Sequence, residues 1–271
     1  QSNFISTNAS GTGALGDGAT GITVNGGRIY VGGAGPGEGN VIGGQRGSGI
    51  AISDVKPATY YRPGFIEVKG NRIGIGADDV TPIPNQDGIK TGTNFPVIIG
   101  GTEPGAANTI AFNRANGVNF PIWDWGNYWG GLFARVLGNR IFDNGDRGII
   151  RGNGMNNDFG DADLGWPLYS PNYPEIKMVG VLNGITQVSG ILDTQSPEQC
   201  LVEIFANRAA DSSGFGEGEQ WITALYPQAD GKFSISIPQD LSGKYLAATS
   251  TRMIPLDGAA STLNSSEFSR A

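Results

Sequence analysis

The chain has no histidine and only one cysteine among its 271 residues. Without histidine, Ser-His-Asp and Cys-His catalysis and histidine-bound metal sites are excluded. Cys200 has no second cysteine with which to form an internal disulfide, so we expect it to be a small buried apolar residue. Any catalysis would therefore depend on carboxylates, arginine or lysine.

Long apolar runs and concentrated charge are also missing. No apolar stretch is long enough to cross a bilayer, so no membrane span is expected. The opening residues, "QSNFISTNAS", lack the basic-then-apolar profile of a secretion signal, which indicates a mature form or an excised piece. The net charge is −7 and the 18 Lys and Arg residues are scattered, so we expect no nucleic-acid partner.

Glycine, in contrast, is abundant, with 45 residues, and the sequence repeats itself. Residues 31–70 align without a gap with residues 99–138, and 12 of the 40 pairs are identical. A shorter signature, Asn-x-Ile, recurs inside this repeat at alternating spacings of 37 and 31 residues. It occupies residues 3–5, 40–42, 71–73, 108–110 and 139–141.

Each signature is followed by Gly-Ile or Gly-Val and then by a third short β-like run such as "RIYVGG" or "FIEVKG". Three short strands in each unit of 31–37 residues describe one turn of a solenoid, whose stacked turns share a core. The sequence therefore predicts an all-β protein in which residues 1–155 form about five turns of a parallel β-helix. A leucine-rich solenoid is the alternative, but its leucine ladder is missing.

The asparagine of each signature has two interpretations. Five asparagines at one position per turn could stack into a buried amide ladder, or they could be polar ligands for a substrate. Because every turn carries the asparagine, we favour the ladder. Arg72 and Arg140, one residue further on, should point outward into solvent.

The motifs "GNRIGIGADDVTPIPNQDGI", "VIIGGTEPGAANTIAFNRANGV" and "GNRIFDNGDRGI" resemble a known family. They are similar to the right-handed parallel β-helix repeats of the pectate-lyase-like superfamily, in the glycine-rich form found in large bacterial secreted and cell-surface proteins. The resemblance covers about residues 1–175 and implies an extracellular or cell-surface location. The family contains enzymes and non-enzymes, so the resemblance is specific for fold and weak for activity.

The pattern changes after an acidic and aromatic linker at residues 156–175. Alternating apolar and polar runs in residues 176–271 predict a small antiparallel β-sandwich, immunoglobulin-like in outline. "ADGK" (229–232) predicts a hairpin between the runs on its two sides. This part resembles a module that often follows such β-helices, in which a second cysteine usually stands where this chain has Ala210; the resemblance thus implies that a bridge to Cys200 is lost.

Two long loops interrupt the repeat at equivalent places, residues 53–64 and 121–132, and should leave the same edge about 10 Å apart. Their aromatic faces could stack on sugar rings while charged groups bind hydroxyls. The alternatives are that the aromatics pack on one another or contact a protein. The candidate ligand-binding residues are Tyr60, Tyr61, Arg62, Trp123, Asp124, Trp125, Tyr128 and Trp129.

Asp158, Asp161 and Asp163 lie close together in the linker, and their oxygens would suit Ca²⁺, although the EF-hand spacing is absent. An ordinary acidic turn is the alternative. The loop that carries Asp211, Glu217 and Glu219 is a weaker candidate of the same kind.

The sequence thus favours a non-catalytic extracellular or cell-surface module for adhesion, contact with a polysaccharide or cell-surface glycan, or structural assembly. Self-association through the solenoid ends is expected because the chain opens on a repeat turn, "SNFIS", without a recognisable cap. The alternative is a polysaccharide lyase or glycoside hydrolase that acts along the groove of the β-helix, but no spacing of acidic residues identifies a catalytic pair.

Overall fold

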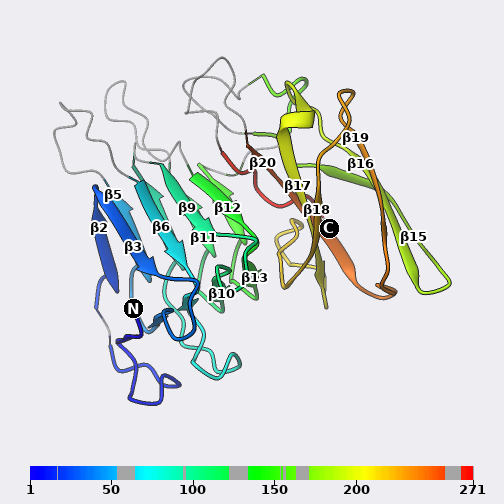
Figure 1. The fold of residues 1–271 in the computed structure, drawn as a ribbon. Helices are drawn as coiled ribbons and strands as arrows, with labels where there is room; N and C mark the ends of the chain where they lie inside the picture. Colours follow the sequence, from blue (N-terminus) through cyan, green and yellow to red (C-terminus); the bar gives the residue numbers. More distant parts are fainter. Residues whose placement is uncertain are drawn as a thin grey trace.

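The computed structural model describes residues 1–16, 18–53, 65–93, 96–121, 134–152, 154, 157–162, 171–253 and 264–270. In these residues the protein is all-β apart from one 3-10 turn, Pro197–Gln199. A parallel β-solenoid comes first and two small antiparallel sheets follow it, so the predicted fold class is confirmed (Figure 1).

Three parallel sheets form the sides of the solenoid. The first contains β1 (Phe4–Ile5), β4 (Val41–Ile42), β7 (Arg72–Ile73), β10 (Thr109–Ala111) and β13 (Arg140–Phe142). The second contains β2 (Ile22–Asn25), β5 (Ile50–Ser53), β8 (Ile89–Gly92), β11 (Val118–Phe120) and β14 (Ile149–Arg151). The third contains β3 (Arg28–Gly32), β6 (Phe65–Lys69), β9 (Val97–Gly100) and β12 (Ala134–Leu137).

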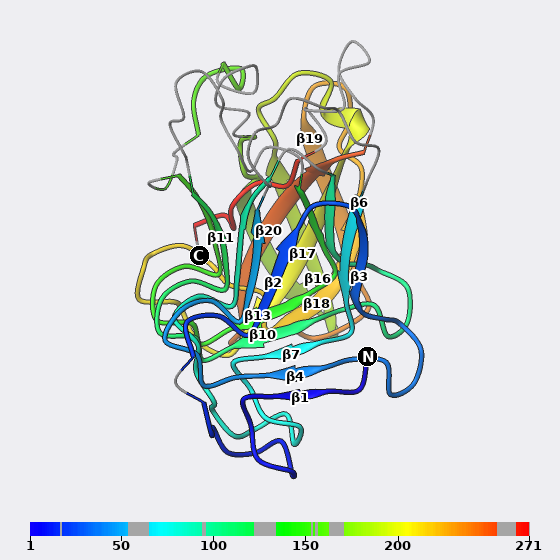
Figure 2. The ribbon, with the colours of Figure 1, turned by 90° about the vertical axis from the view of Figure 1, so that its left-hand side faces the viewer.

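The five Asn-x-Ile signatures stack directly on one another. Their isoleucines pair in register from β1 to β13, as Figure 2 shows for the stack of short strands. Among the described residues there are four complete three-strand turns, and the fifth turn has only β13 and β14. The number of turns thus differs slightly from the predicted value of about five. Two-residue strands suffice because each turn needs only enough extended backbone to pair with its neighbours.

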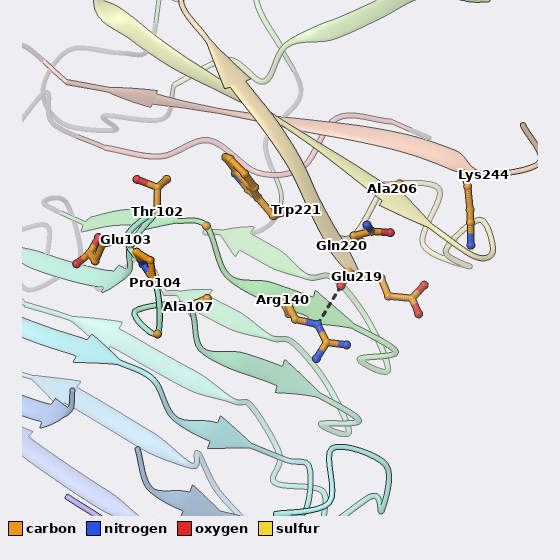
Figure 3. A pocket seen from close by; sticks show the side chains of 13 residues that line it. Thr102, Glu103, Pro104, Ala107, Arg140, Ala206, Glu219, Gln220, Trp221 and Lys244 are labelled. Atoms are coloured by element: carbon orange, nitrogen blue, oxygen red, sulfur yellow. Dashed lines mark hydrogen bonds between the residues drawn. The ribbon is translucent and has the colours of Figure 1, made fainter. Parts of the chain in front are cut away.

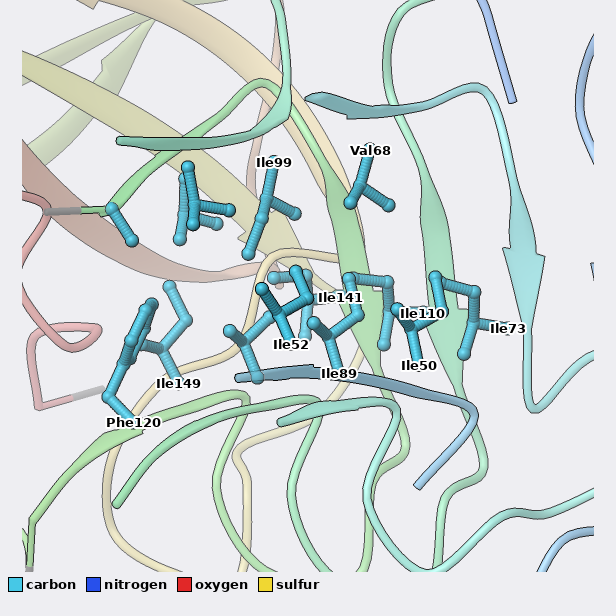
Figure 4. Packing of buried hydrophobic residues seen from close by; sticks show 14 of the residues in the cluster. Ile50, Ile52, Val68, Ile73, Ile89, Ile99, Ile110, Phe120, Ile141 and Ile149 are labelled. Carbon is cyan, nitrogen blue, oxygen red and sulfur yellow. The ribbon is translucent and has the colours of Figure 1, made fainter. Parts of the chain in front are cut away.

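The core of the solenoid is a set of aliphatic columns that run along its axis (Figure 4). Ile73, Ile110 and Ile141 belong to one column, and Ile50 and Ile89 belong to another. All five are at most 1% exposed. Since one turn cannot bury its own apolar face, stacking of identical positions makes this core.

The predicted asparagine ladder is confirmed. In each step a side-chain Nδ2 donates to the Oδ1 of the asparagine one turn further along the chain, at 2.8–3.0 Å. The same Oδ1 also accepts the backbone N–H of the preceding asparagine. The ladder thus satisfies buried groups on every turn after the exposed first one; its members are Asn3, Asn40, Asn71, Asn108 and Asn139.

A second ladder was not predicted. Asn85 donates through Nδ2 to Oδ1 of Asn113 at 3.1 Å, and Asn113 donates likewise to Asn144 at 2.9 Å. Gln45 extends this second ladder through its backbone N–H, which donates to Oδ1 of Asn85 at 3.2 Å. In three turns the amide residue of the second ladder (Gln45, Asn113 or Asn144) stands five residues after the asparagine of the first ladder. The sequence therefore contains a signal for the second ladder.

Two three-stranded antiparallel sheets form the sandwich. One sheet contains β15 (Glu175–Leu182), β16 (Ile185–Ile191) and β19 (Lys232–Ile237). The other contains β17 (Cys200–Asn207), β18 (Gln220–Leu225) and β20 (Tyr245–Arg252). Cys200 is 3% exposed beside apolar neighbours, and burial raises the pKa of its thiol to about 11, as expected for a residue that acts only in packing.

The predicted hairpin at "ADGK" is wrong. Gln228 and Lys232 close a tight turn there through a backbone hydrogen bond of 2.8 Å, but β18 and β19 on its two sides belong to different sheets. The turn therefore carries the chain across the sandwich. The hairpin forms instead at Asn183 and Gly184, which both adopt positive φ between β15 and β16.

In the sheet β18-β17-β20, β17 and β20 are buried on both faces, whereas β18 is only partly buried. Val202 and Ile204 of β17 pack into the sandwich core, whereas Phe205 faces the solenoid and joins the solenoid core together with Ala247 and Phe268. Alternation along the strands explains this division. The solenoid core is thus closed at its end by side chains of the sandwich and of the C-terminal segment 264–270.

Candidate functional site

The aromatic loops predicted from the sequence lie outside the described residues, and so do Tyr60, Tyr61, Arg62, Trp123, Asp124, Trp125, Tyr128 and Trp129. The strands that lead into these loops are described. β5 and β11 belong to the same sheet with β8 between them, so the two chain segments leave the same sheet two turns apart, as predicted.

Two of the three proposed calcium ligands can be placed. Oδ1 of Asp158 accepts the backbone N–H of Ala162, and Oδ1 of Asp161 accepts that of Asn172. Asp163 lies outside the described residues. Within the part of the chain that the structure describes, no three His, Cys, Asp or Glu side chains gather as a metal site would require. Glu217 and Glu219 of the other acidic loop bind different partners, Asn144 and Arg208.

The C-terminal segment covers the edge of β12. The backbone N–H of Ala134 donates to Oδ1 of Asn264 at 2.9 Å, and that of Val136 donates to Oγ of Ser265 at 2.7 Å. Ser265 returns a backbone hydrogen bond to Ala134 at 3.0 Å. This segment therefore occupies the place that a further strand of the third sheet would take.

Buried carboxylates accept hydrogen bonds from other polar groups of the last solenoid turn. Oε1 of Glu217 accepts both the backbone N–H and Nδ2 of Asn144, each at 3.2 Å, and thereby takes the position of the next amide in the second ladder. Glu267 accepts the backbone N–H of Arg151 at 2.8 Å and forms an ion pair with Arg147 at 2.6 Å. Burial raises the pKa of Glu217 to about 7, against the opposing effect of the hydrogen bonds from Asn144.

Glu203 on β17 is the third such carboxylate and is fully buried. Its Oε1 accepts the backbone N–H of Gly138 and the indole N–H of Trp221, each at 2.9 Å. Burial raises the pKa of Glu203 to about 7, and these two hydrogen bonds act in the opposite direction. The carboxyl group thus joins the last turn of the solenoid to a tryptophan of the sandwich.

A groove of about 510 Å³ lies where the solenoid meets β17 and β18 (Figure 3). We call it the junction groove. Trp221 stands on its sandwich wall and is 37% exposed, while Arg140 stands on the solenoid wall and donates through Nε to the backbone oxygen of Glu219 at 3.2 Å. The lining comprises residues 101–105, Ala107, Gly138 and Arg140 from the solenoid, and Ala206, residues 219–221 and Lys244 from the sandwich.

The two carboxylates of the junction groove are already paired with cations. The hydrogen bond from Lys69 lowers the pKa of Glu103. Burial raises the pKa of Glu219, but the hydrogen bonds from Arg208 outweigh it, so that the net pKa is lowered. In contrast, no hydrogen bond from the Nη groups of Arg140 or from the ammonium group of Lys244 is found among the described residues, although the charge of Lys244 also helps to lower the pKa of Glu219. The groove therefore offers free donors as well as bonded acceptors.

Sequence reasoning missed most of this groove. Arg140 was expected to be solvated, but its guanidinium lies over the ring of Phe142, with 5.2 Å between Cζ and the ring centroid, at the groove wall. Arg72 points outward as expected, with its side chain 38% exposed, and there it donates two hydrogen bonds of 2.8 Å to Asp79. Trp221 had only one signal, an aromatic residue two positions after Glu219 of the acidic loop.

Comparison with protein-family models, with curated proteins and with solved structures gives no match for this chain. Across the described ranges, no helix has the length and apolar character needed to cross a membrane. The functional argument therefore depends on the geometry of the junction groove.

Proposed function

We propose that this chain is a non-catalytic extracellular or cell-surface module that contacts glycans through the junction groove. The observation that carries this proposal is the exposed indole of Trp221, held by Glu203 in a groove of about 510 Å³ with free donors. A sugar ring stacks well on an indole face, and its hydroxyl groups need donors and acceptors placed around that face. Arg140 and Lys244 supply donors, and Glu103 and Glu219 supply acceptors.

The protonation states in the groove support a non-catalytic role. Hydrolysis of a glycosidic bond requires one carboxyl group with a raised pKa as an acid and a second one as a base or nucleophile. Glu103 and Glu219 both have lowered pKa values, so neither is a suitable acid. Glu203 and Glu217 have raised values, but both are buried and bonded to the solenoid.

The wider assignment belongs to the same proposal. Kinship with the β-helix repeats of large bacterial secreted proteins would place the chain outside the cell, where glycans are exposed. Self-association is a further part of it. Because the sandwich covers one end of the solenoid, end-to-end contacts would use the side of β1, and light scattering at high concentration that shows only monomers would exclude them.

Binding to an array of neutral and charged oligosaccharides, followed by calorimetry, tests the glycan proposal. Trp221→Ala should lower the affinity of a bound oligosaccharide about five- to thirtyfold, because loss of a stacking platform costs about 1–2 kcal/mol. Tyr226→Ala is the matched control, since Tyr226 is also an exposed aromatic residue of the sandwich but does not line the groove. Its affinity should not change.

Four results would contradict the proposal. No binding to any glycan would remove it, and equal loss in both variants would attribute the effect to stability. Binding abolished by Trp123→Ala or Trp129→Ala, and retained in Trp221→Ala, would move the site to the aromatic loops. Release of products from a polysaccharide, with or without Ca²⁺, would replace the non-catalytic role with the enzymatic alternative.

A further inference from the structure

One carboxylate oxygen connects the two walls of the junction groove. Gly138 lines the groove from the solenoid and Trp221 lines it from the sandwich. Oε1 of Glu203 accepts an N–H from each of them at 2.9 Å. Because both donors share one acceptor, the position of the indole relative to the solenoid wall is set by this single atom.

The rest of the Glu203 carboxyl group is not bonded. Oε2 is buried and has no hydrogen-bond partner in the described part of the chain. Thr249, the cross-strand partner of Glu203 on β20, also has a buried Oγ1 without a partner. Ala224 is the partner on β18, so the side chains that face Glu203 from both neighbouring strands are uncharged. The charged side chains of the adjoining groove are Glu103, Arg140, Glu219 and Lys244.

We infer that Glu203 is a positioning residue that fixes the indole of Trp221 to the solenoid wall and so sets the shape of the junction groove. A glutamate that is fully buried, with one oxygen unpaired among the described residues, is costly for stability, so its presence is better explained by what Oε1 holds than by a gain in folding energy. This inference rests on the proposed function of the groove, but its geometry can be tested without any ligand.

Protonation of Glu203 should change how firmly the indole is held. An N–H donor binds an ionised carboxylate more strongly than a neutral carboxyl group. With the pKa raised to about 7, Glu203 changes charge near neutral pH. The indole is therefore held more firmly above pH 7, although burial of the ionised carboxylate makes the folded protein less stable there. A residue that serves only packing would not show these two opposite trends.

The test is a pH titration followed by the indole N–H resonances of the five tryptophans in ¹⁵N–¹H spectra, with the Trp221 signal assigned by its loss in Trp221→Phe. We expect this resonance to move downfield with a midpoint near pH 7. In Glu203→Gln, which keeps an acceptor oxygen but does not titrate, it should stay constant from pH 5 to 9. Glu217→Gln is the matched control, because Glu217 is also buried with a pKa of about 7 but binds Asn144; the Trp221 titration should persist there.

A Trp221 resonance that does not move with pH in the unmodified chain would overturn the inference, even if Glu203→Gln fails to fold. Persistence of the titration in a folded Glu203→Gln would also overturn it. Because no glycan is used, these results are independent of the proposed function. Absence of glycan binding with a normal titration removes the function and leaves the positioning role, whereas binding without a titration does the opposite.

Discussion

The interior of the solenoid and its junction with the sandwich satisfy the same buried groups with different chemistry. Between turns, Oδ1 of one asparagine accepts the backbone N–H and the Nδ2 of another, as in the pair Asn113 and Asn144. At the junction, Oε1 of Glu217 accepts the same two groups from Asn144. The geometry is conserved across the boundary, but the accepting group changes from an amide to a carboxylate.

The difference follows from what each group can donate. An amide has both a donor and an acceptor, so it passes the pattern on to the next turn. An ionised carboxylate only accepts, so it ends the pattern. The end of the ladder thus carries a cost that its middle does not, because a buried carboxylate is strongly desolvated. A repeat can be extended with neutral groups, whereas its last turn is completed by groups that respond to pH.

The largest effect that we expect from the difference between the solenoid interior and the junction is a dependence of the protein's stability on pH. Glu203 and Glu217 have pKa values raised from 4.5 to about 7 in the folded protein. Each therefore contributes stability that is fully present below pH 4.5 and is lost as the pH rises to about 7, amounting to roughly 3 kcal/mol for each group. The free energy of unfolding, measured in denaturant between pH 4.5 and 8, should fall over this range.

The control is the double variant Glu203→Gln, Glu217→Gln, whose stability should be nearly constant from pH 4.5 to 7. Groups with lowered pKa values, such as Glu103 and Glu219, act in a separate window, since they lose their contribution only as the pH falls below their ordinary values. An unmodified chain whose stability rises from pH 4.5 to 7 would contradict the contrast between the two regions.

The next effect concerns the middle of the ladder. Asn108→Ala removes the Oδ1 that accepts the backbone N–H and the Nδ2 of Asn71. It also removes the Nδ2 that donates to the backbone oxygen of Val68 and to Oδ1 of Asn139, and all these groups are buried. We expect a loss of about 4 kcal/mol in the free energy of unfolding, since unsatisfied buried groups cost about 1–3 kcal/mol each. Asn25→Ala is the control, because Asn25 is exposed, and it should cost less than about 1 kcal/mol. Similar losses in the two variants would show that the ladder adds nothing specific.

Much of the solenoid could be predicted because each of its turns repeats the same physical requirement. The spacing of Asn71, Asn108 and Asn139 gave the register of one sheet directly, since an amide ladder demands one residue per turn. The sandwich was less accessible: "ADGK" indicates a tight turn, and a tight turn forms, but which strands pair beyond it depends on the core and not on the turn.

The junction groove could not be predicted, because it is made by residues that are distant in sequence and belong to no repeat. Glu203 reads as an ordinary polar position in an alternating strand, and nothing near it in the sequence indicates that Gly138 and Trp221 meet at its side chain. Only the docking of β17 on the last turn brings them together. Contacts of this kind arise from the three-dimensional packing and have no repeated signal in the sequence.

The central claim is that Glu217 occupies the last position of the ladder that the asparagines form, and a pair of double-mutant cycles tests it most directly. One cycle combines Asn113→Ala with Asn144→Ala, and the other combines Asn144→Ala with Glu217→Ala, with unfolding in denaturant as the readout. We predict a coupling energy of about 1–2 kcal/mol, of the same sign, in both cycles. Additive effects for Asn144 and Glu217, beside a clear coupling of Asn113 with Asn144, would contradict the account.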